Sequence, residues 1–214
     1  MNFSALLFTI SDMIGCVAFA LSGSMVALHY RLDLFGNIVL AMTTAMGGGL
    51  IRDLIIGCTP PMMFQNPTYA IVASSVAVIM FLLARFSKNL YDRREPHINA
   101  LANVFDAIGL GAFTVVGMRS GIAAGFSDNG FLLVFLSLLT GVGGGVLRDL
   151  FVQRMPNVLH KHVYAVAVLI GAVVNLMMFR LNVRDVFATP ATIVLVFTIR
   201  MLATHYRWNL PHAS

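Results

Sequence analysis

Two copies of one short motif place glycines beside an arginine and an aspartate inside apolar sequence. The first copy, from Gly47 to Leu54, reads Gly-Gly-Gly-Leu-Ile-Arg-Asp-Leu, and the second, from Gly143 to Leu150, reads Gly-Gly-Gly-Val-Leu-Arg-Asp-Leu. A glycine weakens a helix by about 1 kcal/mol, and a charge at mid-membrane depth costs at least about 2.5 kcal/mol. Because the chain bears both costs twice, we interpret the motif as the wall of a polar passage.

The ionisable and hydroxyl side chains near this motif suit the binding of a hard cation. The charged candidates are Arg52, Asp53, Arg148, Asp149, Asp12 and Asp106, and the hydroxyl candidates are Thr43, Thr44 and Thr140. Four carboxylates against two guanidiniums leave two surplus negative charges if all are ionised, which favours a cation over an anion. Oxygen ligands suit alkali and alkaline-earth ions. The pattern contains no thiolate or histidine set, so no bound metal or other cofactor is expected.

The partners of the charged side chains can be predicted from helix geometry. Neighbouring residues such as Arg52 and Asp53 project about 100° apart around a helix, which disfavours a contact between them. Partners are therefore expected from the other copy of the motif or from the other repeated segment. The expected pairs are Arg52 with Asp149 or Asp106, and Arg148 with Asp53 or Asp12. The alternative is that each Arg-Asp pair is a structural clasp only.

Composition indicates whether the helices that position these residues lie in water or in a membrane. Of the 214 residues 58% are hydrophobic and only 11% are charged, and the mean hydropathy is +0.85, so the chain is an integral membrane protein. Runs of roughly 20 apolar residues, long enough to span a bilayer, lie at 4–28, 34–57, 68–86, 100–118, 130–152, 163–180 and 190–206. We therefore predict an all-α fold of seven transmembrane helices. No segment is left for a soluble catalytic or nucleic-acid-binding domain.

The repeat extends beyond the glycines and divides the chain into units. Asp12, Gly15 and Phe19 recur as Asp106, Gly109 and Phe113, and Pro60 and Tyr69 recur as Pro156 and Tyr164. We assign a first three-helix repeat to 1–95, a second to 96–186, and a seventh helix with a tail to 187–214. Because each repeat has an odd number of spans, the second enters the membrane from the opposite face, as in many transporters.

The glycine triplets should interrupt or bend the second and fifth predicted helices. Three residues without Cβ allow a kink and a close backbone approach, and freed carbonyls are tolerated only in protein or in a wet cavity. For Gly47, Gly48, Gly49, Gly143, Gly144 and Gly145 we favour a kink at a pore. For the single glycines of the first and fourth helices, tight helix packing is the preferred interpretation.

Basic residues in short loops predict the orientation in the membrane. One side collects Arg31, Arg85, Lys88, Arg93, Arg94, Arg154, Lys161 and Arg207, and the other has Arg119, Arg180 and Arg184. The side richer in lysine and arginine is cytoplasmic in most membrane proteins. The N-terminus is therefore expected outside and the C-terminus in the cytoplasm. We expect Arg200, near the inner end of the last helix, to extend to the lipid headgroups.

Together, the doubled Gly-Gly-Gly-x-x-Arg-Asp motif, the paired helices containing Asp12 and Asp106, and the three-plus-three-plus-one layout resemble the prokaryotic branch of the trimeric intracellular cation (TRIC) channels, a group also labelled glycine transporters. The resemblance covers essentially the whole chain. It implies a homotrimer in the inner membrane of a prokaryote. It also implies a pore in each subunit, lined by the second and fifth helices, that conducts K⁺ and, less selectively, Na⁺. The Lys-Glu-Val signature of the animal members is absent.

The leading hypothesis is therefore a channel for monovalent cations with no bound cofactor other than permeant K⁺ or Na⁺. The alternative is a secondary transporter of a small zwitterion such as glycine, because inverted repeats with broken helices are also the architecture of carriers. An enzyme is not expected, since the sequence has no recognisable catalytic signature. The expected partners are the lipid bilayer and further copies of the chain, and no nucleic acid.

Overall fold

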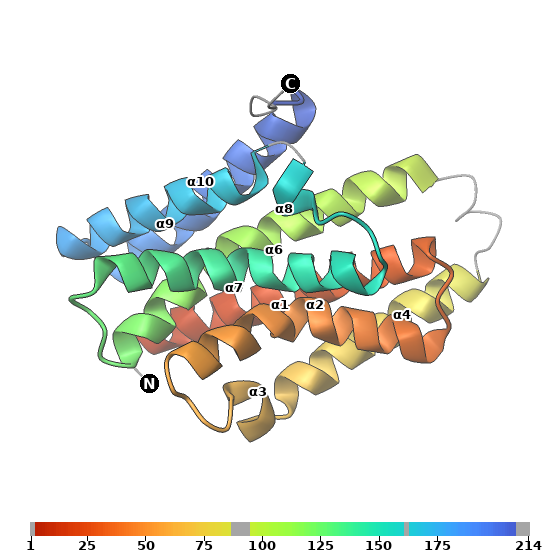
Figure 1. Ribbon diagram of the computed structural model, residues 1–214, viewed down its shortest axis with the longest axis horizontal. Coiled ribbons are helices and arrows are strands. Elements are labelled where there is room, and N and C mark those ends of the chain that lie inside the picture. Colours follow the sequence, from red (N-terminus) through yellow and green to blue (C-terminus); the bar gives the residue numbers. More distant parts are fainter. Residues whose placement is uncertain (1–2, 87–94, 161–162, 209–214) are drawn as a thin grey trace.

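The computed structural model of the protein describes residues 3–86, 95–160 and 163–208. Every regular element in these ranges is an α-helix, and the long helices run along the long axis of the molecule (Figure 1). The long helices are α1 (Phe3–His29), α2 (Leu34–Ile55), α4 (Thr68–Phe86), α6 (Glu95–Ala123), α7 (Gly130–Phe151), α9 (Tyr164–Arg180) and α10 (Asp185–His205). Two short helices, α3 (Met62–Gln65) and α8 (Asn157–His160), follow α2 and α7. The predicted all-α membrane fold is confirmed.

Seven of these helices correspond to the seven predicted spans. Six are long and apolar enough to cross a bilayer, and α9, with 17 residues, is a shorter apolar helix. At 1.5 Å per residue α9 is about 26 Å long, slightly less than the hydrocarbon thickness of about 30 Å. Four of the basic residues used to predict the orientation, Lys88, Arg93, Arg94 and Lys161, lie outside the described residues.

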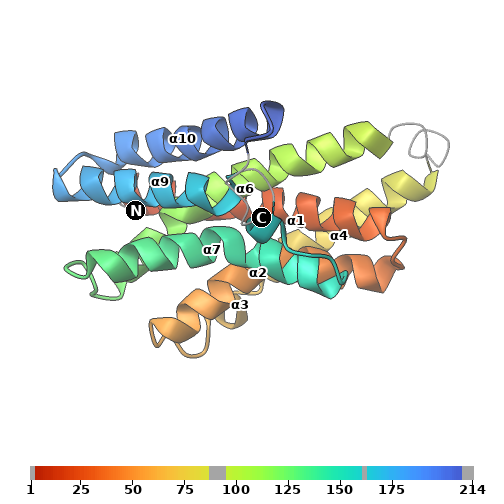
Figure 2. The ribbon, with the colours of Figure 1, turned by 45° about the horizontal axis from the view of Figure 1, so that its top comes forward.

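Four helices form the centre of the molecule, and the others flank them. Helix α1 packs on α2 and α6, and α7 packs on the same two helices, which closes a four-helix ring. Helix α4 covers α1 and α2 on one side, whereas α9 and α10 lie on the other side against α6 and α7 (Figures 1 and 2). The helices α1 to α4 thus make contacts that α6 to α9 repeat, and α10 stands outside the repeat.

Helices α2 and α7 are continuous through their glycine triplets, so the predicted interruption of the helices is wrong. Each triplet lies in the C-terminal half of its helix, and the Arg-Asp pair follows about one turn before the helix ends. The backbone of each triplet stays helical. The missing side chains serve a close contact between α2 and α7 and do not break the helix. A bend without a break stays a prediction.

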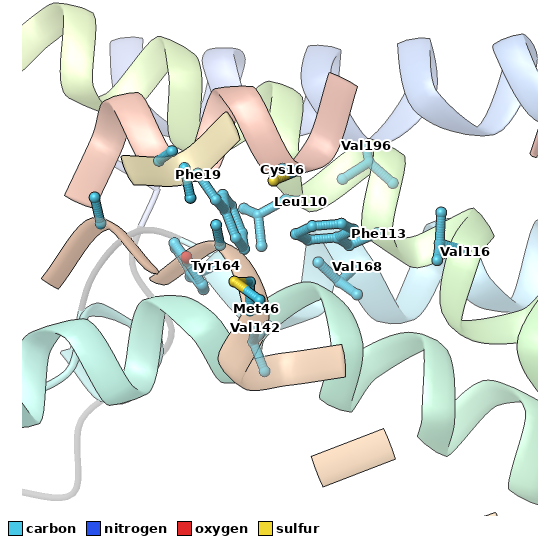
Figure 3. Packing of buried hydrophobic residues seen from close by; sticks show 14 of the residues in the cluster. Cys16, Phe19, Met46, Leu110, Phe113, Val116, Val142, Tyr164, Val168 and Val196 are labelled. Carbon is cyan, nitrogen blue, oxygen red and sulfur yellow. The ribbon is translucent and has the colours of Figure 1, made fainter. Parts of the chain in front are cut away.

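An apolar core with internal pseudo-symmetry fills the space between the central helices. The rings of Phe19 on α1 and Phe113 on α6 meet edge to face, with 5.1 Å between their centres (Figure 3). Each ring also lies over a glycine of the other helix, Phe113 over Gly15 and Phe19 over Gly109, where a Cβ would collide with it. The single glycines on α1 and α6 therefore serve helix packing, as preferred from the sequence.

Candidate functional site

The glycine triplets bring the backbones of α2 and α7 together at the centre of the molecule. A Cβ on Gly48 would lie 2.5 Å from the carbonyl oxygen of Thr140, and a Cβ on Gly144 would collide with the carbonyl oxygen of Thr44. These two contacts are equivalent under the repeat, because each joins the middle glycine of one triplet to the threonine four residues before the middle glycine of the other. In this conformation the middle glycines are packing residues and not the wall of an open passage.

The three candidate threonines take different positions around this crossing. The hydroxyls of Thr44 and Thr140 donate to the carbonyl oxygens of Leu40 and Leu136, one turn earlier in their own helices, at 2.6 Å. Both threonines are buried, whereas Thr43 is half-buried. Because the two buried hydroxyls donate to the backbone, only their lone pairs are left for a ligand.

In the first repeat, Arg52 pairs with its neighbour Asp53. The Nε and Nη2 atoms of Arg52 donate to Oδ1 of Asp53 at 2.9 and 2.8 Å, and Oδ2 of Asp53 accepts the backbone N–H of Met62 at 2.9 Å. The prediction that neighbouring Arg and Asp side chains stay apart is wrong, because the long arginine side chain curls around the helix end. Asp53 thereby ties the end of α2 to the start of α3.

The second repeat holds its arginine in a larger cluster. Arg148, which is 2% exposed, donates from Nε to Asp149 at 2.9 Å and from Nη1 to Asp106 and to the hydroxyl of Ser22, both at 2.7 Å. Asp149 also accepts from Nη2 of Arg154 at 2.7 Å. Its Oδ2 atom accepts the backbone N–H of Asn157 at 2.9 Å, the counterpart of the Asp53 contact.

All predicted charge pairs between the two copies of the motif are therefore wrong. Arg52 meets neither Asp149 nor Asp106, and Arg148 meets neither Asp53 nor Asp12; each arginine pairs inside its own repeat. The physical reason is the direction of the helices. Helices α2 and α7 cross in their C-terminal halves and run past each other, so their last turns, which carry the charges, lie on opposite sides of the crossing. The clasp interpretation of the sequence agrees with this geometry.

A narrow cavity of about 40 Å³ lies beside the charged pair of the first repeat. Its polar lining comes from Asp12, Arg52, Asp53, Tyr69 and Thr140, and Gly49 and Phe113 lie at its apolar wall. The hydroxyl of Tyr69 donates to Oδ2 of Asp12 at 2.5 Å. Since a water molecule needs roughly 10–15 Å³ of such space, the cavity has room for a few waters. We call it the first-repeat cavity.

A wider cavity of about 280 Å³ lies beside the charged cluster of the second repeat. It is lined by Ser22, Val26, His29, Ala102, Asn103, Asp106, Arg148, Arg154 and Asn157. We call it the second-repeat cavity. The aromatic pair of Phe19 and Phe113 (Figure 3) and the glycine crossing of α2 and α7 lie in the apolar core at the centre of the molecule. Along α1, Phe19 lies between Asp12 at the first-repeat cavity and Ser22 at the second-repeat cavity.

Several residues at these sites were not among the candidates from the sequence, and Ser22, Tyr69, Tyr164, Arg154 and Arg200 are the ones with the clearest contacts. Tyr69 and Tyr164 are repeat equivalents, and their recurrence was the signal that could have placed them at the site. Arg154 was assigned to a cytoplasmic loop, and only the structure shows its contact with Asp149. Arg200 was expected at the headgroups, but it is 2% exposed and its guanidinium lies 4.7 Å from the ring centre of Tyr164.

The fold and the site define a class: a helical membrane protein built from two inverted three-helix repeats, with a cavity beside the charged groups of each repeat and an apolar centre. The family model described as "Glycine transporter" matches the chain twice, over residues 9–85 and 103–180. The chain belongs to this family, which is the prokaryotic branch of the TRIC family.

Relatives and solved structures agree with this assignment. The chain is 34% identical to a UPF0126 membrane protein of Bacillus subtilis, covering 95% of each chain, and 31% identical to the UPF0126 inner membrane protein YadS of Escherichia coli, covering 94% of this chain and 93% of the relative. A structure described as "Structural basis for conductance through TRIC cation channels" is 34% identical with a TM-score of 0.82, covering 97% of each chain. A TRIC orthologue from Rhodobacter sphaeroides is 27% identical with a TM-score of 0.83, covering 94% of this chain and 98% of that one.

Proposed function

We propose that this protein is a passive channel for monovalent cations, with K⁺ preferred over Na⁺ and one pore in each subunit along the crossing of α2 and α7. The observation that carries the proposal is the pair of cavities, each with charged side chains in its lining, on opposite sides of a short apolar barrier. Its family relatives of known structure include proteins described as TRIC cation channels. The arrangement corresponds to a non-conducting state, because an apolar constriction excludes water and ions until it widens.

Opening would require α2 and α7 to move at the glycine crossing. The contacts of Gly48 with Thr140 and of Gly144 with Thr44 leave no space for water, yet they involve backbone atoms without interlocking side chains. Such a surface allows the two helices to slide or bend at these two contacts without a change of rotamer there, whereas the side chain of Leu147, which lies over Gly47, would have to move. The triplet glycines would then line the widened passage, as the sequence predicted.

Single-channel recording tests the proposed function most directly. Purified protein in planar bilayers should give unitary currents whose reversal potential in a KCl gradient follows the cation equilibrium potential, and exchange of K⁺ for Na⁺ on one side should shift it to show a K⁺ preference. Boiled protein and empty vesicles are the controls. Folded protein without unitary currents would contradict a channel.

The family description gives one competing function, a carrier for glycine. Two cavities separated by a barrier are also the expected architecture of an alternating-access transporter, and a guanidinium such as Arg52 could bind a carboxylate. Proteoliposomes loaded with unlabelled glycine should then show saturable uptake of labelled glycine by counterflow. We expect no counterflow from this protein, and its presence without unitary currents would favour the carrier.

We also propose the assembly and location that follow from the family. The protein would be a homotrimer in the inner membrane of a bacterium, with its N-terminus outside and its C-terminus in the cytoplasm. The proposal is supported by a relative described as an inner membrane protein and by a structure described as a trimeric intracellular cation channel orthologue. Chemical cross-linking in native membranes should give a ladder that ends at three subunits, and a ladder ending at two would contradict it.

A further inference from the structure

The two cavities are related by the repeat but differ in charge. The first-repeat cavity is lined by two carboxylates, Asp12 and Asp53, and one guanidinium, Arg52, which leaves one negative charge. At the second-repeat cavity, Asp106 and Asp149 face two guanidiniums, so the charges cancel. The inverted fold is therefore symmetric in backbone but not in electrostatics.

The difference in charge comes from a single exchange between repeat-equivalent positions, Cys58 and Arg154. The backbone N–H of Cys58 donates to the carbonyl oxygen of Asp53 at 2.8 Å, and that of Arg154 donates to the carbonyl oxygen of Asp149 at 3.0 Å. The two residues thus occupy the same place after their helices. Only Arg154 supplies a guanidinium, which adds a second cation on Asp149, whereas Asp53 accepts from Arg52 alone among side chains of the described residues.

The partners of the repeat-equivalent aspartates, Asp12 and Asp106, show where this extra negative charge lies. Asp106 forms an ion pair with Arg148 at 2.7 Å. Asp12 is half-buried at the wall of the first-repeat cavity, and among the described residues its hydrogen-bond partner is the neutral hydroxyl of Tyr69. A hydrogen bond from a hydroxyl stabilises a carboxylate without cancelling its charge. The surplus negative charge of the first-repeat cavity is therefore located at Asp12.

From these contacts we infer that Asp12 concentrates cations in the first-repeat cavity and that conduction rectifies. A cleft lined by one sign of charge raises the local concentration of counter-ions, so cations should flow more readily from the first-repeat cavity to the second-repeat cavity than in reverse. This inference rests on the proposed channel function. Salt weakens the effect, because the Debye length falls from about 10 Å at 0.1 M to about 3 Å at 1 M.

The test is the current–voltage relation of single channels in symmetric KCl. A membrane-impermeant thiol reagent added to one chamber reacts with half-buried Cys58 and identifies the side of the first-repeat cavity, since the other described cysteine, Cys16, is buried. At about 0.1 M KCl the current carried by cations from the Cys58 side should exceed the opposite current at equal voltage. At about 1 M KCl the two currents should become nearly equal.

Three variants separate the electrostatic cause from other asymmetries. Asp12→Asn should make the low-salt relation linear, whereas Tyr69→Phe, which removes the hydroxyl but keeps the carboxylate, should preserve the rectification. The double exchange of Cys58→Arg with Arg154→Cys moves one positive charge between the cavities and should reverse the direction of rectification. This exchange keeps the inference testable if Asp12→Asn does not fold.

A linear low-salt relation in the wild type, or rectification that is unchanged in both Asp12→Asn and the double exchange, would overturn this inference while leaving the channel function intact. Folded wild-type protein without any unitary current would overturn the proposed function, and the inference would fall with it.

Discussion

At the scale of single residues, the arginines of the doubled motif neutralise buried carboxylates. Arg148 contacts two buried carboxylates and the hydroxyl of Ser22, whereas Arg52 contacts one carboxylate only. Removal of one partner of a buried ion pair costs about 3–5 kcal/mol, because the remaining charge is left uncompensated in a medium of low polarity. The two repeats should therefore differ in their sensitivity to the loss of the arginine.

Arg148→Ala should destabilise the protein more than Arg52→Ala. The first variant leaves Asp106 without its cationic partner and Asp149 with Arg154 alone, so we expect a loss of about 3–5 kcal/mol and little folded protein. The matched variant Arg52→Ala leaves only Asp53 unpaired, and that carboxylate keeps the N–H of Met62. The fraction of protein that elutes as a monodisperse peak after heating in detergent measures both. Equal losses would show that the number of contacted carboxylates does not set the stability.

The residues of the site were predictable from the repeat, but their contacts were not. The recurrence of Asp12, Arg52 and Asp53 with their second-repeat counterparts placed every acidic and basic candidate near a cavity or a clasp. Pairing was wrong because a rule for neighbours on a helix surface does not describe a guanidinium folded around a helix end. Arg154 was missed because a loop arginine usually reports membrane topology, and nothing in the sequence places it on Asp149.

At the scale of elements, the contact between α2 and α7 depends on the absence of side chains. Gly144→Ala should destabilise the protein, because its Cβ would collide with the carbonyl oxygen of Thr44, which cannot move without the helix. Overpacking of this kind costs about 1–3 kcal/mol. Gly49→Ala is the matched control in the other triplet. A Cβ there meets Arg52 Nη2 at 3.5 Å, an ordinary contact, so we expect a neutral or slightly stabilising effect. Thermal unfolding in detergent distinguishes the two, and similar melting temperatures would argue against a tight crossing.

The aromatic pair between α1 and α6 should control the opening of the proposed pore. Phe113 lies at the wall of the first-repeat cavity and packs edge to face on Phe19. Phe113→Ala shortens the apolar barrier, which should raise the open probability of single channels, because wide polar passages wet more easily than apolar ones. Leu133→Ala, which truncates a buried residue on α7 outside both cavities, is the control for lost packing. An open probability that rises equally in both variants would assign the effect to general loosening.

Most of the helices could be predicted from the sequence. The exceptions are places where tertiary packing overrides the intrinsic helix preference of a residue. The seven apolar runs predicted the long helices to within a few residues at most ends, although α6 begins at Glu95 and α10 at Asp185, earlier than expected. The glycine triplets were expected to interrupt or bend their helices; the helices are not interrupted, and Gly48 and Gly144 contact the opposite backbone there. Helices α3 and α8, of four residues each, are too short to leave a periodic signal.

At the scale of the whole molecule, the inverted repeat separates two charged ends by an apolar centre. Charges at the last turns of α2 and α7 lie toward opposite ends because the two helices run past each other at the glycine crossing. In a bilayer this arrangement keeps most ionised groups away from the midplane, where their burial costs most. The glycines of the crossing carry no polar side chain and lie near the midplane, where water is scarcest. The same division explains how one motif can carry both ion pairs and tight packing.

This arrangement makes the equivalent positions Cys58 and Arg154 face opposite sides of the membrane. In intact cells an impermeant maleimide should label Cys58, which is predicted to lie outside, whereas Arg154→Cys in a Cys58→Ser background should be labelled only in inverted vesicles. Cys58→Ser alone is the control, since Cys16 is buried and should not react from either side. Labelling of both positions from one side would contradict the inverted repeat. Labelling of Cys58 only in inverted vesicles and of Arg154→Cys in intact cells would agree with the inverted repeat. It would show that the orientation predicted from the basic loops is wrong.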